Sequence, residues 1–400
     1  MILKPLKRFL FLVKLFVHIC DNLAMVLLLD GKKTAKKLLD DLKKQIESSS
    51  LKIKLATIFD QKNPGSSMYV NMKVKKAAQV GIESEEFKVD ESWNTDKVVS
   101  LVRKLNDDPT VSGILVQSPL PETVDEKIVF DEISPLKDAD GLTAKNQGLL
   151  FQDSKIAHAL PATPSGVIKL LNEYDFVFSG KQALVIGRSV LFGRPMSLLL
   201  VNRDMTVTLA HSKTPKETLI KEAKNADLII VAVGKAEWFD LQDLKNSAVV
   251  IDVGANRKDS KAVGDVNFDE VSKRVAAITP VPGGVGPMTI ATLIEQTYNL
   301  ALEQKRRKIS MKKAVITVVG DDKPGIIAAV STRLSENQIN ILDVSQTLMD
   351  NVFTMSMLVD ITKVDDKFQE LQNSLKELGK NMSVSIHTQR QEIFDTISKI

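Results

Sequence analysis

Apolar and polar positions alternate with two different periods along the first 300 residues. Short apolar runs, typical of buried strands, occur at residues 51–58, 111–117, 183–187, 206–210, 228–233 and 248–253. Amphipathic stretches with helical spacing separate several of these runs, including residues 34–47 and the segment that carries Tyr69 and Lys73. Continuous apolar strands joined by helices are typical of parallel sheets that are covered on both faces. We therefore expect an α/β protein.

The apolar runs divide into two α/β domains. We expect the first over residues 25–147 and the second over residues 148–287, where four strands predict a doubly wound, Rossmann-like parallel sheet. A loop rich in proline and glycine then leads into a helix with apolar side chains at helical spacing. We expect this helix, residues 288–304, to pack back on the first domain and complete it.

A different order of elements begins after the basic segment 305–310, which we expect to be a linker. Residues 311–400 show a strand, a loop and helix, two strands, a helix from about Asp365 to Leu378, and a final strand. This βαββαβ order predicts an independent ferredoxin-like domain.

Composition narrows the possible partners. The formal net charge is +4, and residues 1–24 supply +3 of it, with four basic side chains against one acidic. The rest of the chain is nearly neutral, so we expect no nucleic acid as a partner. One cysteine and four histidines exclude a disulfide framework and offer no metal-ligand spacing. We expect no metal, and a reducing compartment, the cytoplasm.

Residues 1–24 combine basic residues with an apolar stretch from Phe9 to Ile19 that Lys14 interrupts. The stretch is too short and too charged to span a membrane, and we expect no membrane partner. A signal or transit peptide is one interpretation. We favour an N-terminal extension that is not native, because Met25 opens a plausible cytosolic domain.

The segment SSMYVNMK, residues 66–73, places Tyr69 and Lys73 four residues apart in a helical pattern. On a helix this spacing puts a phenol and an amine on one face, where both can meet a single ligand. A surface helix with a solvent-exposed lysine is the alternative, and the spacing alone does not exclude it.

The turn GRSVLFGRP, residues 187–195, follows an apolar strand and precedes an apolar helix. Glycines at such a turn let a phosphate approach backbone N–H groups at the helix N-terminus. Ser189 stands where the usual fingerprint has its second glycine, and Gly193 comes one residue late, so a plain turn is the alternative. The candidate cofactor contacts are Gly187, Arg188, Ser189 and Gly193.

The end of the next strand indicates which dinucleotide binds. NAD-binding domains place an acidic residue there for the ribose 2′-hydroxyl, whereas NADP needs groups that hold a 2′-phosphate. Residues 206–210 are followed by HSKT, which contains no carboxylate. Ser212, with Lys213 beside it and Arg188 from the turn, therefore predicts NADP. A solvated loop is the alternative.

Two polar groups follow strands of the first domain, where open α/β sheets bind ligands. GILVQSPLP supplies Gln117, which can donate or accept a hydrogen bond, and KDADG supplies Asp140, which can pair with a guanidine-like ring edge. A strand ended by proline and an aspartate-stabilised turn are the alternatives. Of the two aspartates in this motif, Asp138 is the better candidate for stabilising the turn, and Asp140 for binding a ligand.

In their order and spacing these motifs resemble one known family. YVNMK, VQSPLP, KDADG, PATPSG, GRSVLFGRP, HSKT, DVGANR and PVPGGVGPMT are similar to the motifs of the bifunctional methylenetetrahydrofolate dehydrogenase/methenyltetrahydrofolate cyclohydrolase family, over about residues 25–303. From about Met311 the chain separately resembles a small ACT-type regulatory domain, with DDKPGI at the usual position of the ligand loop.

The resemblance implies that the two α/β domains form a folate cleft, with Lys73 as the catalytic amine. Tyr69 would stack on or hydrogen-bond the substrate, Gln117 would tune the lysine, and Asp140 would grip the pterin ring. The other implied substrate contacts are Ser66, Ser118, Pro119, Pro282 and Gly283, and Ala255 is an implied contact on the nicotinamide side.

The implied function is one-carbon folate interconversion, which serves purine biosynthesis. NADP would oxidise 5,10-methylenetetrahydrofolate, and water would convert the methenyl product to 10-formyltetrahydrofolate. Both resemblances imply a homodimer, and the ACT-type unit implies an amino-acid effector.

Three positions depart from the family pattern. Ser118 stands where leucine is usual, Ala162 where cysteine is frequent, and Ala255 where isoleucine is usual. Ser118 lies on the implied substrate wall and Ala255 on the implied cofactor side, so these two positions bear on folate and NADP affinity.

Two other functions are consistent with parts of the pattern. The chain could be an amino-acid-sensing regulator that uses the folate domain as a binding surface, but Tyr69, Lys73, Gln117 and Asp140 argue against this. It could also be a dehydrogenase alone, against which Lys73 argues. The junction before Met311 could join two adjacent reading frames.

Overall fold

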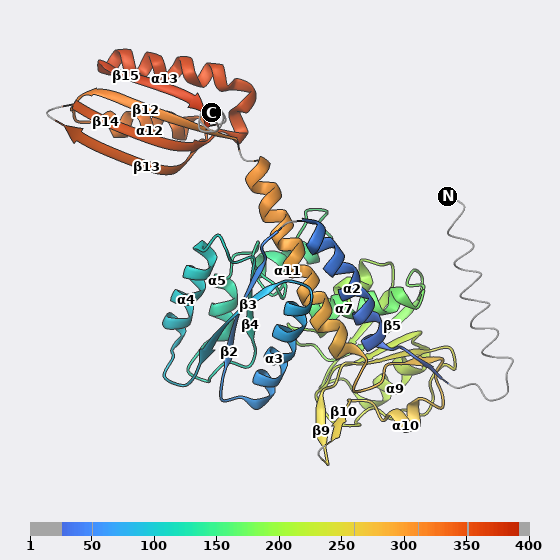
Figure 1. The fold of residues 1–400 in the computed structure, drawn as a ribbon. Helices are drawn as coiled ribbons and strands as arrows, with labels where there is room; N and C mark the ends of the chain where they lie inside the picture. Colours follow the sequence, from blue (N-terminus) through green and yellow to red (C-terminus); the bar gives the residue numbers. More distant parts are fainter. Residues whose placement is uncertain (1–25, 50, 260, 311, 350–351, 392–400) are drawn as a thin grey trace. The chain divides into compact units, whose positions relative to one another are not determined.

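The computed structural model describes residues 26–391 except 50, 260, 311 and 350–351, and the chain divides into two compact units (Figure 1). The first unit ends at Leu302 and the second begins at Glu303. The proposed extension, residues 1–24, lies outside the described residues. In the part of the chain that is described, no helix is both long and apolar enough to cross a membrane.

The smaller sheet of the first unit has three parallel strands in the order β3-β2-β4. They are β2 (Lys54–Asp60), β3 (Glu83–Val89) and β4 (Gly113–Gln117). The helices of this part are α3 (Pro64–Gln79), α4 (Thr95–Asp107) and α5 (Glu126–Glu132). The apolar pattern predicted β2 and β4 but missed β3, because ESEEFKV is an edge strand with mostly polar side chains.

The larger sheet is parallel, with the strand order β1-β11-β8-β7-β5-β6. Its strands are β1 (Leu27–Leu28), β5 (Gln182–Ile186), β6 (Thr206–Ala210), β7 (Leu228–Val231), β8 (Val249–Asp252) and β11 (Ala277–Ile278). The order reverses between β5 and β7, which is where doubly wound sheets bind ligands. The predicted Rossmann-like sheet is confirmed.

Strand β1 lies within residues 25–147, the range expected for the first domain, and it pairs with β11 of the larger sheet. We propose that the first unit contains two domains. The folate domain is residues 25–147, completed by the return helix 288–304, and the NADP domain is residues 148–287.

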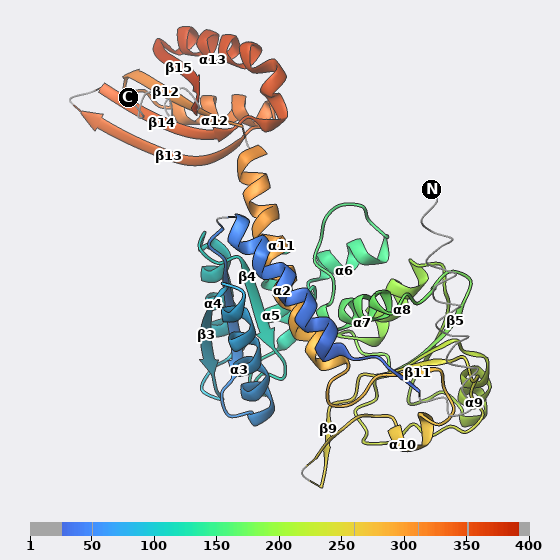
Figure 2. The same cartoon turned by 45° about the vertical axis from the view of Figure 1, so that its right-hand side comes forward.

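Three helices join the two sheets through one hydrophobic core. They are α2 (Gly31–Ser49), α7 (Ala162–Glu173) and α11 (Val285–Ser310), and α2 lies beside α11 in both Figures 1 and 2. The core includes Leu55 of β2 and Val185 of β5 together with Ile294 of α11. Helix α11 therefore shares one core with both sheets.

Helix α11 is longer than its sequence pattern predicted. It continues through residues 305–310, which we expected to be a linker, and these residues are helical. The segment contains neither proline nor glycine and is rich in lysine and arginine, which favour helix, so nothing in the sequence ends the helix there.

The remaining elements of the first unit are short. They are α6 (Ala144–Phe151), α8 (Gly193–Val201), α9 (Lys216–Asn225), α10 (Phe268–Val271), and the antiparallel pair β9 (Asn256–Lys258) and β10 (Lys261–Val263).

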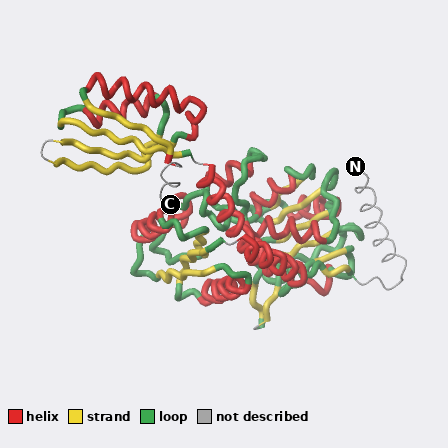
Figure 3. Tube along the Cα trace, turned by 45° about the horizontal axis from the view of Figure 1, so that its top comes forward, coloured by secondary structure: helices red, strands yellow, loops and turns green. Residues whose placement is uncertain are grey.

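The second unit has the predicted βαββαβ order, and its antiparallel sheet has the strand order β13-β14-β12-β15. Its elements are β12 (Lys313–Asp321), α12 (Ile326–Glu336), β13 (Asn340–Met349), β14 (Val352–Asp360), the 3₁₀ helix η1 (Thr362–Lys367), α13 (Phe368–Met382) and β15 (Val384–Arg390). Figure 3 shows both α-helices of this unit on one face of its sheet. Alternate strand residues such as Ile316 and Met355 are buried in the core with Leu334 of α12.

Candidate active site

Lys73 lies on α3, and local sequence fixes where this helix begins. Asn63 caps the helix, because its side-chain oxygen accepts the N–H of Ser66 at 3.0 Å. Pro64 follows in the first turn, where a backbone N–H is not needed. The buried residues of α3 recur at helical spacing, and they are Ser66, Val70, Lys73 and Ala77. Lys73 is therefore on the inward face of the helix.

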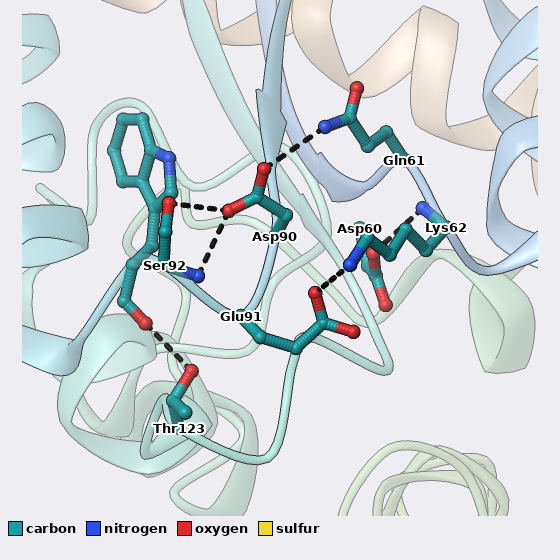
Figure 4. Close-up of polar contacts among 8 residues, drawn as sticks. Asp60, Gln61, Lys62, Asp90, Glu91, Ser92 and Thr123 are labelled. Carbon is teal, nitrogen blue, oxygen red and sulfur yellow. Dashed lines mark hydrogen bonds and ion pairs between the residues drawn. The ribbon is translucent and has the colours of Figure 1, made fainter.

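The loop before α3 is tied to the loop that follows β3 (Figure 4). Gln61 Nε2 donates to Asp90 Oδ2 at 3.2 Å, and Lys62 forms an ion pair with Glu91. Asp90 Oδ1 also accepts the backbone N–H of Ser92 at 2.9 Å and its hydroxyl at 2.6 Å. These exposed contacts contribute little stability individually. Together they fix the loop that presents the cap of α3.

The Lys73 amine is buried and hydrogen-bonded. Only 6% of the residue is exposed, and Nζ donates to Oε1 of Gln117 at 2.8 Å. Gln117 is the last residue of β4, and its Nε2 donates to the Ser118 carbonyl at 2.9 Å, which orients the amide. Burial lowers the pKa of Lys73, although the Asp140 carboxylate opposes this effect. The amine is therefore easier to deprotonate than an exposed lysine.

Asp140 is close enough to this amine for each group to shift the pKa of the other. A short parallel bridge between Ile114 and Asp138 carries the chain alongside β4, and Asp140 Oδ1 accepts the N–H of Ala162 at 3.3 Å. Burial raises the pKa of Asp140 to about 6, against the attraction of Lys73. Burial thus drives both groups toward their neutral forms, and their mutual attraction resists it.

Asp138 has the structural role that its position in the turn predicted. Its Oδ1 accepts the N–H of Leu142 at 3.1 Å, and its Oδ2 accepts the N–H of Thr143 at 2.8 Å and the Asn146 amide at 2.9 Å. These hydrogen bonds hold the turn, which leaves Asp140 as the carboxylate near Lys73.

Two other predicted residues of α3 precede Lys73 by one and two helical turns. Tyr69 is half-buried one turn before it. Ser66 is buried, and its hydroxyl has no hydrogen-bond partner among the described residues. A buried hydroxyl without a partner is costly unless a ligand or water satisfies it. The inward face of α3 therefore offers a hydroxyl, a phenol and an amine.

The loop after β4 depends on Glu126, which the sequence analysis did not single out. The carboxylate of Glu126 accepts the Ser118 hydroxyl at 2.8 Å and the backbone N–H of Leu120 at 2.6 Å. It thereby holds both residues that flank Pro119. The serine that replaces the usual leucine is thus engaged within the protein, and the signal for this pair was a hydroxyl eight residues before a carboxylate.

The loop that carries Pro282 and Gly283 packs tightly against the start of α2. The Gly283 carbonyl accepts the N–H of Lys32 at 2.9 Å. A Cβ at Gly31 would lie 1.8 Å from the Gly284 carbonyl oxygen, so no side chain fits there. This contact fixes the loop through backbone atoms on both sides.

The turn after β5 has the close backbone contacts of a dinucleotide-binding turn. Gly187 has φ +127°, and a Cβ there would lie 2.2 Å from the Ala232 carbonyl oxygen. A Cβ at Gly193 would lie 1.8 Å from the Gly187 carbonyl oxygen. Ser189, in place of the second glycine, accepts the N–H of Phe192 on its hydroxyl at 3.1 Å. These residues suit a pyrophosphate at the start of α8.

Arg188 and Ser212 lie at the same edge of the larger sheet. Ile186 pairs with Ala210 in the parallel register of β5 and β6, so each of the two residues lies two positions beyond a strand end. Both are exposed. Lys213 is also exposed, and its N–H donates to His211 Nδ1 at 3.2 Å within the turn. The turns after β5 and β6, residues 187–192 and 211–214, offer a guanidinium and a hydroxyl to a 2′-phosphate and contain no carboxylate.

Two buried aspartates organise the loops on either side of Ala255, and the sequence analysis missed both. Asp265 is fully buried. Its oxygens accept hydrogen bonds from four donors, which are Val233 N at 2.6 Å, Gly234 N at 2.9 Å, Lys235 N at 2.8 Å and Asn256 Nδ2 at 2.8 Å. One carboxylate therefore joins the loop after β7 to the loop after β8.

Asp252, the last residue of β8, holds the same region from the other side. It accepts the backbone N–H groups of Gly254 at 2.9 Å, Asp265 at 2.8 Å and Val266 at 3.0 Å. Burial raises the pKa of Asp252 to about 6 against these hydrogen bonds. Ala255 is exposed on the loop between the two aspartates, as a cofactor contact would have to be. Within the described residues, no cluster of histidine, cysteine and carboxylate side chains could hold a metal ion.

Family comparisons identify both parts of the first unit. Residues 29–140 match the model of the tetrahydrofolate dehydrogenase/cyclohydrolase catalytic domain, and residues 161–305 match the model of its NAD(P)-binding domain. The chain belongs to this family. Residues 312–389 match the ACT domain. Both resemblances seen in the sequence are confirmed, and the chain is a folate dehydrogenase and cyclohydrolase that carries an ACT domain.

Curated relatives match this chain along nearly their whole length. The bifunctional protein FolD of Oenococcus oeni is 57% identical over 281 residues, which are 70% of this chain and 99% of the relative. FolD of Leuconostoc citreum is 50% identical over 277 residues, which are 69% of this chain and 98% of the relative. Each relative therefore matches the folate enzyme over nearly its whole length. About 30% of this chain lies outside each match.

Solved structures agree with the sequence relatives. FolD from Campylobacter jejuni is 41% identical with a TM-score of 0.67, and the match covers 70% of this chain and 99% of that one. The Trypanosoma brucei enzyme, solved with NADP and an inhibitor, is 33% identical with a TM-score of 0.67, and covers 70% of this chain and 99% of its own.

Proposed function

We propose that both reactions of this family occur at one site centred on Lys73, with NADP as the co-substrate. The observation that carries the proposal is the buried Lys73 amine, hydrogen-bonded to Gln117 and electrostatically coupled to Asp140. The first reaction converts 5,10-methylenetetrahydrofolate to the 5,10-methenyl cation. The second adds water to that cation and yields 10-formyltetrahydrofolate.

The oxidation needs positioning more than acid or base catalysis. When NADP is bound, its nicotinamide accepts the hydride that leaves the one-carbon unit. The protein must therefore hold the pterin so that this carbon faces the cofactor. Asp140 holds the pterin through its N–H donors, Tyr69 packs beside the ring, and Ser66 provides a hydroxyl. Ser118, Pro119, Pro282 and Gly283 form the proposed walls of the site.

The hydrolysis needs proton transfer. Water attacks the methenyl carbon and loses a proton, and the carbon–nitrogen bond to N5 then breaks as N5 takes up a proton. A lysine with a lowered pKa exchanges protons more readily than an exposed one, and the positive charge of the bound substrate would lower the pKa of Lys73 further. Gln117 holds the amine in place through its Oε1.

Activity is expected to fall on the acid side of pH 6, because ionised Asp140 accepts hydrogen bonds from the pterin more strongly than the neutral acid does. The pKa of Asp140 is raised to about 6, so the group is a carboxylate above this pH and a neutral acid below it. We expect kcat/KM for methylenetetrahydrofolate to decline as pH falls through this value. Initial rates at fixed ionic strength give the profile. If the fall of kcat/KM at low pH, the acid limb of the profile, is unchanged in Asp140→Asn, another group causes it.

NADP is expected to be used in preference to NAD, because Arg188 and Ser212 lie where a 2′-phosphate would bind. In the double variant Arg188→Ala, Ser212→Ala, we expect KM for NADP to rise roughly 10- to 100-fold and KM for NAD to change little. Spectrophotometric rates with each cofactor, following both the reduced nucleotide and the methenyl intermediate, test the function and the preference together.

Thr206→Ala, at the opposite end of β6, is the matched control. If the double variant keeps the preference of the unmodified enzyme for NADP over NAD, the two residues do not bind the 2′-phosphate. No turnover of methylenetetrahydrofolate with either nucleotide would contradict the proposed function itself.

The two family matches support a wider proposal. We propose a homodimer in the cytoplasm whose 10-formyl product supplies purine biosynthesis, and an ACT domain that binds an amino-acid effector through the loop before α12. In support of an effector site, Gly325 has φ +94° at the start of that helix, where a loop and helix N-terminus can receive a carboxylate. Sedimentation velocity tests the dimer, and calorimetry with individual amino acids tests the effector.

A further inference from the structure

Gln296, on α11, uses its side-chain amide to join two separate segments. Its Nε2 donates to the Ala139 carbonyl at 2.7 Å and to the Leu160 carbonyl at 2.9 Å. Its Oε1 accepts the N–H of Leu160 at 2.9 Å. Both amide donors and one acceptor site are thus used on backbone groups, and none of the three bonds is made within α11.

The two joined segments are the ones that hold Asp140. Ala139 directly precedes it, and the N–H that Asp140 accepts belongs to Ala162, two residues after Leu160. On the other side of Asp140, Gly141 has φ +69°, and a Cβ there would lie 2.3 Å from the Leu160 carbonyl carbon. Residues 139–141 and 160–162 are therefore in direct backbone contact, with Gln296 across their junction.

Helix α11 also contacts the strand that positions Gln117. A Cβ at Gly113, the first residue of β4, would lie 3.2 Å from the methyl group of Thr297 and 3.3 Å from the Ala139 Cβ. The helix, the strand and the segment before Asp140 thus meet at one point. Gln296 is next to Thr297 in the helix, so the same turn of α11 that touches β4 also binds the Asp140 segment.

We propose that Gln296 is a positioning residue for Asp140, fixing this carboxylate relative to Lys73 and Gln117 through the Ala139 and Leu160 backbones. The inference rests on the proposed role of Asp140 in holding the pterin. Loss of the amide would leave three part-buried backbone groups without partners, and the two segments would separate as water reached them. Asp140 would then lose its fixed orientation and part of its desolvation.

The test is Gln296→Met, which keeps side-chain length and removes all three hydrogen bonds. We expect KM for methylenetetrahydrofolate to rise roughly tenfold, with the dissociation constant for NADP unchanged. The acid limb of kcat/KM should also move to lower pH, because water near Asp140 reduces the burial that raises its pKa. A residue with only a structural role would not move this limb.

Leu300→Ala is the matched control, because Leu300 is also buried on α11 and makes none of these hydrogen bonds. It should lower Tm and leave the folate KM and the acid limb in place. Gln296→Glu is the second variant if the methionine variant does not fold. It keeps the acceptor for the Leu160 N–H, loses both donors, and should raise the folate KM in the same direction.

Asp140→Asn separates the two ways in which the inference could fail. If Asp140→Asn raises the folate KM and neither Gln296 variant does, Gln296 does not position the carboxylate. If Asp140→Asn leaves the folate KM unchanged, the proposed role of Asp140 is wrong, and the inference about Gln296 falls with it. A lower Tm with unchanged folate KM and acid limb in Gln296→Met would assign the residue a structural role alone.

Discussion

Replacing Lys73 with methionine is expected to lower the cyclohydrolase rate by about 10³-fold and to leave part of the dehydrogenase activity. Hydrolysis of the methenyl cation requires a proton to be removed from water and another to be delivered to nitrogen, and methionine can do neither. Hydride transfer depends on how the pterin and the nicotinamide are held, which methionine preserves better because it fills most of the same buried space. The two activities should therefore separate in this variant.

The measurement follows methenyltetrahydrofolate decay and NADP reduction in parallel with the purified protein. Lys75→Met is the matched control, since Lys75 is an exposed lysine on the same helix. Its two rates should match those of the unmodified enzyme. Full cyclohydrolase activity in Lys73→Met would remove Lys73 from its proposed role. Equal loss of both activities would indicate that the amine mainly positions the substrate.

Asp265→Ala is expected to destabilise the first unit by about 4 kcal/mol or more and to abolish NADP binding. The carboxylate accepts three backbone N–H groups from residues 233–235 and the side-chain amide of Asn256. Alanine would leave these part-buried donors without the acceptor that joins them. The loops after β7 and β8 would lose their common anchor at the carboxyl edge of the sheet, where the dinucleotide binds.

Urea unfolding followed by tryptophan fluorescence measures this effect. Both tryptophans of the chain, Trp93 and Trp238, lie in the first unit, so the signal reports that unit and not the ACT domain. Asp269→Ala, an exposed aspartate four residues away, is the control and should unfold like the unmodified protein. If Asp265→Ala bound NADP normally at an unchanged urea midpoint, the loops would not depend on this carboxylate.

Most of the fold could be predicted from local sequence patterns. The strands β2, β4, β5, β6, β7 and β8 follow from continuous apolar runs, and the ACT domain follows from the order of its elements. The edge strand β3 and the two-residue strand β1 could not be predicted in this way. β3 is mostly polar. β1 is defined only by its pairing with β11, which lies far away in the sequence. Both are strands because of a neighbour, not because of their own pattern.

The sequence by itself determined which chemical groups are available: a tyrosine and lysine on one helical face, a glutamine and an aspartate after strands, and a glycine-containing turn before α8. Only the tertiary structure decided how these groups behave. Burial depends on packing between segments far apart in the chain. It lowers the pKa of Lys73 and raises that of Asp140, so it favours the neutral form of each group. Two residues that hold the site, Asp265 and Gln296, act on backbone groups of distant segments. Such contacts leave no local pattern, because a backbone N–H or carbonyl is the same at every position in the sequence.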